Sequence, residues 1–111
     1  MIGTLNVTPA RLEEFAHERG FQTFGSAAVD AFHGIEPIDA AGANDVTFCR
    51  FDDERGANWL RRISAGAVFV LPHVAEQAFA WRPAFCIACE IPRMALAEFL
   101  IQFWQAPSSP R

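Results

Sequence analysis

The chain has 111 residues, of which 51% are hydrophobic and 20% charged, and its formal net charge is −4. This length suits one domain with a core of its own, and the acidic balance argues against a general nucleic-acid or anionic-membrane surface, because both need a basic field. All 9 basic residues are arginine, which excludes chemistry that depends on a lysine Schiff base.

The sequence predicts neither membrane insertion nor secretion. No stretch approaches the roughly 20 continuous apolar residues of a membrane span, and the first residues lack the basic start and long apolar core of a signal peptide. We therefore expect a cytoplasmic protein with a single domain over residues 1–106 and a flexible tail over residues 107–111. The 3 cysteines lie in apolar runs, which fits reduced, buried thiols better than a disulfide framework.

The N-terminal third predicts a helix followed by two extended segments. Thr8 can cap a helix that begins at Pro9, and Gly20 ends it. Residues 21–24 then form a brief extended piece. Residues 29–38 mix apolar residues with glycine and proline, which is typical of a bent edge strand and not of a central one.

The central third predicts a βαβ unit. After a turn of small residues at 39–45, the apolar runs 46–51 and 67–71 favour strands, and the amphipathic residues between them favour a crossover helix. We expect three carboxylates to open this helix, where they cap its amides and meet its dipole, and Gly66 to act as its stop. These carboxylates are Asp52, Asp53 and Glu54. Because residues 67–71 show no polar alternation, we expect this strand near the centre of the sheet, covered on both faces.

The C-terminal third predicts a short helix over residues 73–80, a second apolar strand over 84–89 parallel to 67–71, and a helix from Pro92 to about Trp104. The predicted fold class is α/β, with a small mixed, largely parallel sheet, βαβ units and flanking helices.

The last helix has more apolar surface than one sheet face requires. Between Met94 and Trp104 only Glu98 and Gln102 are polar, and Gln105 continues their stripe. Two interpretations are open: the helix is deeply buried, or the outer side of the 93–104 segment binds a second copy or another protein.

Other patterns of reactive residues favour structural roles. Cys86 and Cys89 have the spacing of a redox or zinc half-site, but residues three apart in a strand point to opposite faces, so we expect both thiols in the core. The carboxylates at 52–54 fan out at a helix start and favour capping over metal binding. No histidine stands beside a cysteine or serine nucleophile in a recognised arrangement.

Three features recur in a known family in the same order: the Asp-x-Thr-Phe element at 45–48, the Ala-Gly-Ala-Val sequence at 65–68, and the helix that begins at Pro92. Over residues 8–107 the chain resembles the N-terminal domain of the UDP-3-O-acylglucosamine N-acyltransferase of lipid A synthesis. The resemblance implies a small α/β domain, similar to the N-terminal domain of the Mur ligases, that holds the uridine end of a UDP-sugar. In that family a β-helix of hexapeptide repeats follows and carries the acyl-transfer histidine. This chain ends before any such repeat, so we expect no acyl transfer by the chain itself and no cofactor.

The resemblance also implies a position for the base. Family members stack uracil on the phenylalanine of the Asp-x-Ser/Thr-Phe element, which is Phe48 here. The asparagine and tyrosine that follow in the family are replaced by Phe51 and Glu54. The chain therefore departs from the family pattern both in the polar residue that recognises the base and in the aromatic residue on the other side of the base. Phe51 or Trp59 could supply a second wall. Simple core packing is the alternative role for Phe48.

Polar residues near the same strand complete the predicted site. Arg50 follows the strand and is placed to meet a phosphate, while Asn44 precedes it and could equally serve the turn. The predicted ligand-binding residues are thus Phe48, Arg50, Phe51 and Asn44. We predict no catalytic residue and no metal site.

Three functions remain open at this point. The first is a non-catalytic module that binds a uridine nucleotide or UDP-sugar and assists lipid A or cell-envelope polysaccharide synthesis. The second is a protein-interaction or homo-oligomerisation module with a vestigial nucleotide slot, using the 93–104 helix to bind a second copy or an acyltransferase-like partner. The third, an enzyme acting on an envelope precursor, lacks a nucleophile or general base in the sequence.

Overall fold

The computed structural model describes residues 5–77 and 85–104. The described part folds as a five-stranded mixed sheet flanked by helices. In chain order the elements are α1 (Pro9–Glu18), β1 (Gln22–Phe24), β2 (Gly34–Ile35), β3 (Asp45–Phe48), α2 (Glu54–Arg62), β4 (Ala67–Val70), α3 (Pro72–Gln77), β5 (Phe85–Ala88) and α4 (Pro92–Phe103). The strand order is β1-β5-β4-β3-β2, with β1 antiparallel to β5 and the other neighbours parallel. The predicted α/β class with a largely parallel sheet is confirmed.

Strand β4 lies at the centre of the sheet, as its unbroken apolar run predicts. All its residues are buried, and their side chains alternate between the two faces. Ala67 and Phe69 pack in one core cluster, whereas Val68 and Val70 pack in the other. Because both faces are covered, no polar residue interrupts the strand.

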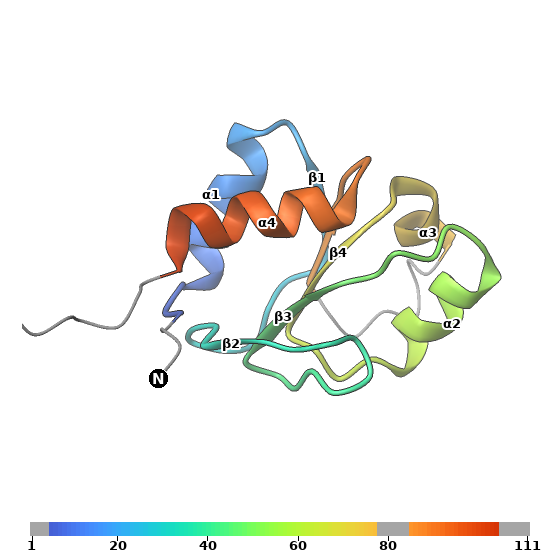
Figure 1. Ribbon diagram of the computed structural model, residues 1–111, viewed down its shortest axis with the longest axis horizontal. Helices are drawn as coiled ribbons and strands as arrows, with labels where there is room; N and C mark the ends of the chain where they lie inside the picture. The colour runs from blue at the N-terminus through green and yellow to red at the C-terminus, as the bar shows by residue number, and fades with distance from the viewer. Residues whose placement is uncertain (1–4, 78–84, 105–111) are drawn as a thin grey trace, which may run out of the picture.

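Helices α1 and α4 cover one face of the sheet and α2 and α3 cover the other (Figure 1). The α1/α4 side is an aromatic core in which Phe15, Phe69 and Phe99 are fully buried. The Phe15 ring centroid lies 6.3 Å from that of Phe69 and 5.6 Å from that of Phe99, with edge-to-face geometry in both pairs. Such pairs add to the hydrophobic stabilisation of a core.

The helix starts follow the sequence closely. The Thr8 side chain accepts a hydrogen bond from the Arg11 amide and caps α1, and Gly20 follows the helix with a φ of 75°. The Asp53 side chain accepts from the Arg55 amide and caps α2, which buries Ala57 and Leu60 against the sheet. The predicted capping role of the 52–54 carboxylates is confirmed for Asp53.

Two local predictions are wrong. The run 46–51 is not one strand, because β3 ends at Phe48; the Cys49 amide still donates to the Phe69 carbonyl, but Phe51 already belongs to the loop before α2. Gly66 is not the stop of α2, which ends at Arg62. A side chain at position 66 would collide with the carbonyl oxygen of Ala43, so this glycine is required by a close approach of two backbone segments.

Some predicted features lie outside the described residues, namely the end of the helix predicted over 73–80, the first residue of the strand predicted over 84–89, and the tail over 107–111. In the segments that are described, no helix has the length and apolar character needed to span a membrane.

Candidate functional site

The outer edge of β3 is open along its second half. Strand β2 pairs Gly34 with Asp45 and Ile35 with Val46, and then ends. In a parallel ladder, alternate residues direct their backbone groups to opposite neighbours. Since the Cys49 amide donates to β4, the backbone of Phe48 faces the side that β2 has left. The N–H and C=O of Phe48 are therefore not paired by β2.

A hollow of about 280 Å³ lies along this edge. We call it the β3-edge hollow. Its lining combines aromatic and apolar side chains with one arginine and one carboxylate: Pro37, Ile38, Asp39, Thr47, Phe48, Arg50, Phe51 and Trp59. The structure thus brings together Phe48, Arg50 and Phe51 from the predicted site, and adds Trp59, the alternative second wall.

Two of the aromatic residues that line this hollow pack on opposite faces of the sheet. Phe48 is half-buried and packs against the α1/α4 core, whereas Phe51 packs against the α2/α3 core. The core role considered for Phe48 and its position in the hollow therefore coexist. The ring of Phe51 has the guanidinium carbon of Arg50 at 5.1 Å from its centroid and that of Arg55 at 4.7 Å. These cation–π contacts restrain the ring.

The loop that carries Phe51 is fixed by α2 and α3. A Cβ atom at Gly56 would lie 2.8 Å from the Phe51 carbonyl oxygen and 2.9 Å from a methyl group of Val74, so only glycine lets α2 start this close. The His73 Nε2 donates to the Asp52 carbonyl oxygen at 2.7 Å and ties the loop to α3. The aromatic wall is therefore part of a packed frame and not of a free loop.

Charges of both signs surround the hollow, and its lining holds one of each, Arg50 and Asp39. Arg55 donates to both carboxylate oxygens of Asp53, and these hydrogen bonds hold the pKa of Asp53 below its ordinary value. The guanidinium of Arg62 lies 4.6 Å from the ring centroid of Trp59. Arg50 is exposed and makes no ion pair within residues 5–77 and 85–104. An anionic group beside the aromatic walls could therefore bind Arg50.

Asn44 is not brought together with the other predicted site residues. It precedes β3, at the end of the strand opposite Arg50 and Phe51. Its side-chain amide donates to the Ala31 carbonyl oxygen at 2.9 Å, which links the turn before β3 to the segment before β2. This contact fits the turn role that the sequence left open for Asn44.

The sequence reading missed the segment from Pro37 to Asp39. These residues are far from Phe48 in the chain but line the same hollow. One signal was present: proline lacks the amide needed to extend a ladder, so Pro37 indicates where pairing beside β3 ends. The end of strand pairing beside β3 was therefore predictable from the sequence. The residues that line the hollow next to it were not.

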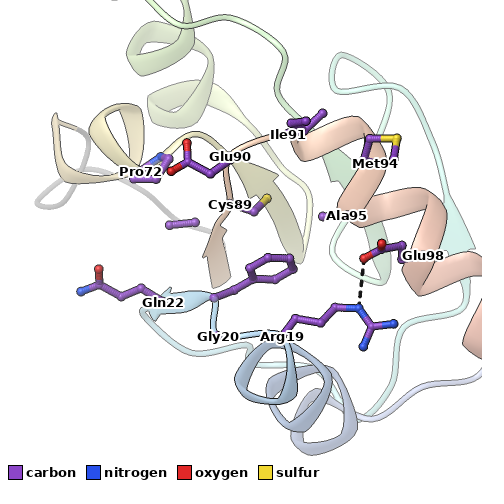
Figure 2. A pocket seen from close by; sticks show the side chains of 12 residues that line it. Arg19, Gly20, Gln22, Pro72, Cys89, Glu90, Ile91, Met94, Ala95 and Glu98 are labelled. Atoms are coloured by element: carbon purple, nitrogen blue, oxygen red, sulfur yellow. Dashed lines mark hydrogen bonds and ion pairs between the residues drawn. The ribbon is translucent and has the colours of Figure 1, made fainter.

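A larger hollow, of about 620 Å³, lies where the carboxyl ends of β4 and β5 meet the start of α4 (Figure 2). Phe21, Ile91 and Met94 give it an apolar wall, and the Arg19 Nε donates to a Glu98 carboxylate oxygen at 3.0 Å on its α1 side. Cys89 also lines this hollow but is only 3% exposed. The lining offers no pair of nucleophile and base.

The cysteines are buried free thiols. Cys86 packs with the α2/α3 core and Cys89 with the α1/α4 core, so the prediction that they point to opposite faces is confirmed. Burial raises the pKa of the Cys89 thiol to about 12 and also raises that of Cys49. In the part of the chain that the structure describes, no cluster of three histidine, cysteine or acidic residues could hold a metal ion.

The thiols are expected to react slowly in the folded protein. At pH 8, raising the pKa of Cys89 from 9.0 to about 12 lowers its thiolate fraction by about a thousandfold. A thiol-specific chromogenic reagent should therefore label the native protein at least a hundredfold more slowly than the protein in guanidinium. Because the raised pKa belongs to the folded state, its stabilising contribution is complete below pH 9 and is lost as the pH rises toward 12. Fast native labelling at pH 8 would contradict the burial of the thiols.

Comparison with known proteins adds no relative. No family model matches the chain, and no curated protein matches it significantly. The resemblance to the acyltransferase domain therefore stays a prediction. The β3-edge hollow and the exposed surface of α4 are the features on which a function can be argued.

Proposed function

We propose that this chain is a non-catalytic module that binds the uridine end of a nucleotide or UDP-sugar in the β3-edge hollow. The observation that carries this proposal is the meeting of Phe48, Phe51 and Trp59 with Arg50 around one cavity at an open strand edge. Aromatic side chains hold planar bases by stacking, and an arginine at the rim can pair with phosphate oxygens.

The dimensions favour a base as the buried part of the ligand. A cavity of about 280 Å³ is at the small end for ligand sites, which usually enclose roughly 300–1,000 Å³. It suits a pyrimidine ring, with the phosphates and sugar lying over the surface near Arg50. The N–H and C=O of Phe48 complement an imide edge, which presents one donor beside one acceptor.

The resemblance of the sequence supports a role in lipid A or cell-envelope polysaccharide synthesis and a likeness to the first domain of the Mur ligases. In the resembling family this domain holds the nucleotide while a separate β-helix transfers the acyl group. We therefore propose an accessory or ligand-holding role, since the hollow contains no nucleophile paired with a base.

Calorimetric titration with UMP, UDP and a UDP-sugar tests this proposal, with CMP and AMP as competing bases. We expect heat from the uridine compounds, and we expect Phe51→Ala to weaken binding by about 5- to 150-fold, because stacking contributes about 1–3 kcal/mol per base. The same titration with Phe48→Ala tests the wall that the sequence predicted. Because Phe48 and Phe51 each also pack against a core cluster, circular dichroism must show that both variants fold before their affinities are compared.

A matched pair of arginine variants tests the phosphate contact. Arg50→Gln should weaken UDP more than uridine, by about tenfold, since a charge-assisted hydrogen bond is lost only with the phosphorylated ligand. Arg93→Gln removes another exposed arginine, on α4, and should leave both affinities unchanged. Absence of heat with every uridine compound at millimolar concentration would overturn the nucleotide proposal.

A second function, protein interaction, is favoured by a separate observation. In the described segments the exposed large hydrophobic residues are Ile91 (59%), Met94 (54%) and Ile101 (84%), all on α4 or at its start. The interpretation that this helix is deeply buried is therefore wrong, and its surplus apolar surface is confirmed. We propose that this face binds a protein, either a second copy or an acyltransferase-like partner.

A further inference from the structure

Helix α4 exposes a short apolar stripe formed by Met94, Ala97 and Ile101, which we call the α4 stripe. The opposite side of the helix buries Ala95, Leu96 and Phe99 against the sheet. The stripe residues are spaced by three and then four positions, which is the spacing of the a and d positions of a coiled coil. The stripe thus has the pattern by which two helices pack side by side.

Charged residues of opposite sign flank the stripe. Arg93 immediately precedes Met94, and Glu98 immediately follows Ala97, so they occupy the g and e positions on the two sides of the helix. Figure 2 shows Glu98 on the α1 side, where it receives the Arg19 hydrogen bond. The Glu98 side chain nevertheless stays 47% exposed, so it remains accessible to a further donor.

Arg93 is exposed, and in residues 5–77 and 85–104 no ion pair of this side chain is found. Its charge is therefore available for an acidic group outside the chain. A second copy of the chain would supply such a group, because its own apolar stripe is flanked by Glu98.

We propose that a second copy of this chain packs on the α4 stripe, with the two α4 helices parallel about a two-fold axis. In parallel coiled coils a g residue lies opposite the e residue five positions later in the other helix. Arg93 is followed by Glu98 at this spacing, so each copy places its Arg93 against Glu98 of the other. The charge pattern is self-complementary in this arrangement.

The antiparallel arrangement is disfavoured by the same charges. An antiparallel pair centred on the stripe brings the two Glu98 side chains together, and like charges at an interface oppose association. The antiparallel pair also leaves Arg93 far from Glu98 of the other copy. Charge therefore selects the parallel pair.

The interface is small, so the dimer should be weak. Helix α4 has 12 residues, a length of about 18 Å at 1.5 Å per residue. Ile91 extends the apolar contact at one end of the stripe. We expect dissociation constants on the order of micromolar, in keeping with a contact at the low end of specific interfaces. This inference rests on the protein-interaction surface proposed above and not on nucleotide binding.

Sedimentation velocity over a concentration series tests whether the stripe associates. The wild type should sediment increasingly as a dimer, and Ile101→Glu should weaken association at least tenfold. Gln102→Glu adds the same charge one residue away, on an exposed position outside the stripe, and should leave the dimer intact. Neither residue is part of the core, so both variants should fold, as circular dichroism can verify.

Charge exchange tests the parallel geometry. Arg93→Glu and Glu98→Arg should each weaken self-association at least tenfold, because each creates two like-charge pairs. An equimolar mixture of these two variants should associate as well as the wild type, and so should the double variant R93E/E98R. Since Arg93→Glu leaves the Arg19 contact untouched, a folding defect in Glu98→Arg, which the double variant would share, would still leave the comparison of Arg93→Glu with the wild type.

These measurements distinguish self-association through the α4 stripe from the parallel pairing of the two helices. A wild type that stays monomeric at millimolar concentration overturns the second copy as the occupant, whether or not uridine compounds bind. Association that Ile101→Glu abolishes but that the mixed variants do not recover overturns the parallel pairing. Recovery in the mixture together with loss in each single variant supports the proposal.

Discussion

Replacing Phe69 with alanine is expected to lower the free energy of unfolding by about 3–5 kcal/mol, the usual effect of truncating a buried aromatic side chain. Phe69 is fully buried in β4, and its ring contacts the rings of both Phe15 and Phe99. Both rings would lose a partner, and the truncation would leave a cavity between the sheet and the two helices. A loss of this size is a large fraction of the roughly 5–15 kcal/mol that stabilises a domain. Urea unfolding followed by circular dichroism measures it.

Two variants serve as controls for this prediction. Phe69→Leu keeps most of the apolar volume and should lose less than half as much stability. Ile101→Ala removes a side chain that is 84% exposed and should change the free energy of unfolding by less than about 0.5 kcal/mol. A loss below 1 kcal/mol for Phe69→Ala would mean that β4 is not the centre of the aromatic core.

The central strand could be predicted because its physical cause is local. A strand covered on both faces needs apolar residues at every position, and residues 67–71 meet that condition without a partner being known. The caps at Thr8 and Asp53 were predictable for the same reason, since a side chain there reaches an amide two or three residues away.

The end of β3 could not be predicted from composition. Residues 46–51 are apolar enough for a longer strand, but Phe51 packs against the α2/α3 side and the chain must turn there to enter α2. The cause is the packing of α2 and α3 against the sheet, which the composition of the run does not reveal. Tertiary packing therefore overrides strand propensity at this position.

The candidate site was predictable only where it is contiguous in the chain. Phe48, Arg50 and Phe51 lie within four residues and meet because β3 ends between them. Asn44 was grouped with them by sequence distance, but a strand rises about 3.3 Å per residue, so residues that precede and follow it lie at opposite ends. Asp39 lines the hollow because β2 ends early, at Ile35, and no local sequence pattern reveals that end.

The two proposed surfaces share no residue. The β3-edge hollow is built from the loop after β2, from β3 and from α2, whereas the α4 stripe belongs to one helix on the other side of the sheet. Ligand binding and self-association can therefore be removed separately, and a variant of one surface serves as a folded control for the other.

Gly66→Ala is expected to lower the free energy of unfolding by about 3 kcal/mol or more, because a new methyl group would collide with backbone that cannot move away. The added carbon would meet the Ala43 carbonyl oxygen and would lie 2.8 Å from the Phe32 ring. The Gly66 amide donates to the carbonyl oxygens of Gly42 and Asp45, each at 3.1 Å, so the substitution would also pull apart the turn that leads into β3. Urea unfolding of the variant measures the loss.

The size of this effect distinguishes the two roles that a glycine can have here. A helix stop in the left-handed region would cost roughly 1–2 kcal/mol on replacement by alanine, whereas a close backbone approach costs more and also shifts the neighbouring turn. Gly42→Ala is the matched control, since a Cβ atom there would make only an ordinary contact of 3.7 Å with the Asp45 carboxylate. If Gly66→Ala were no more destabilising than Gly42→Ala, the contact between the starts of β3 and β4 would be looser than the structure has it, and the open edge beside Phe48 would lose its fixed position.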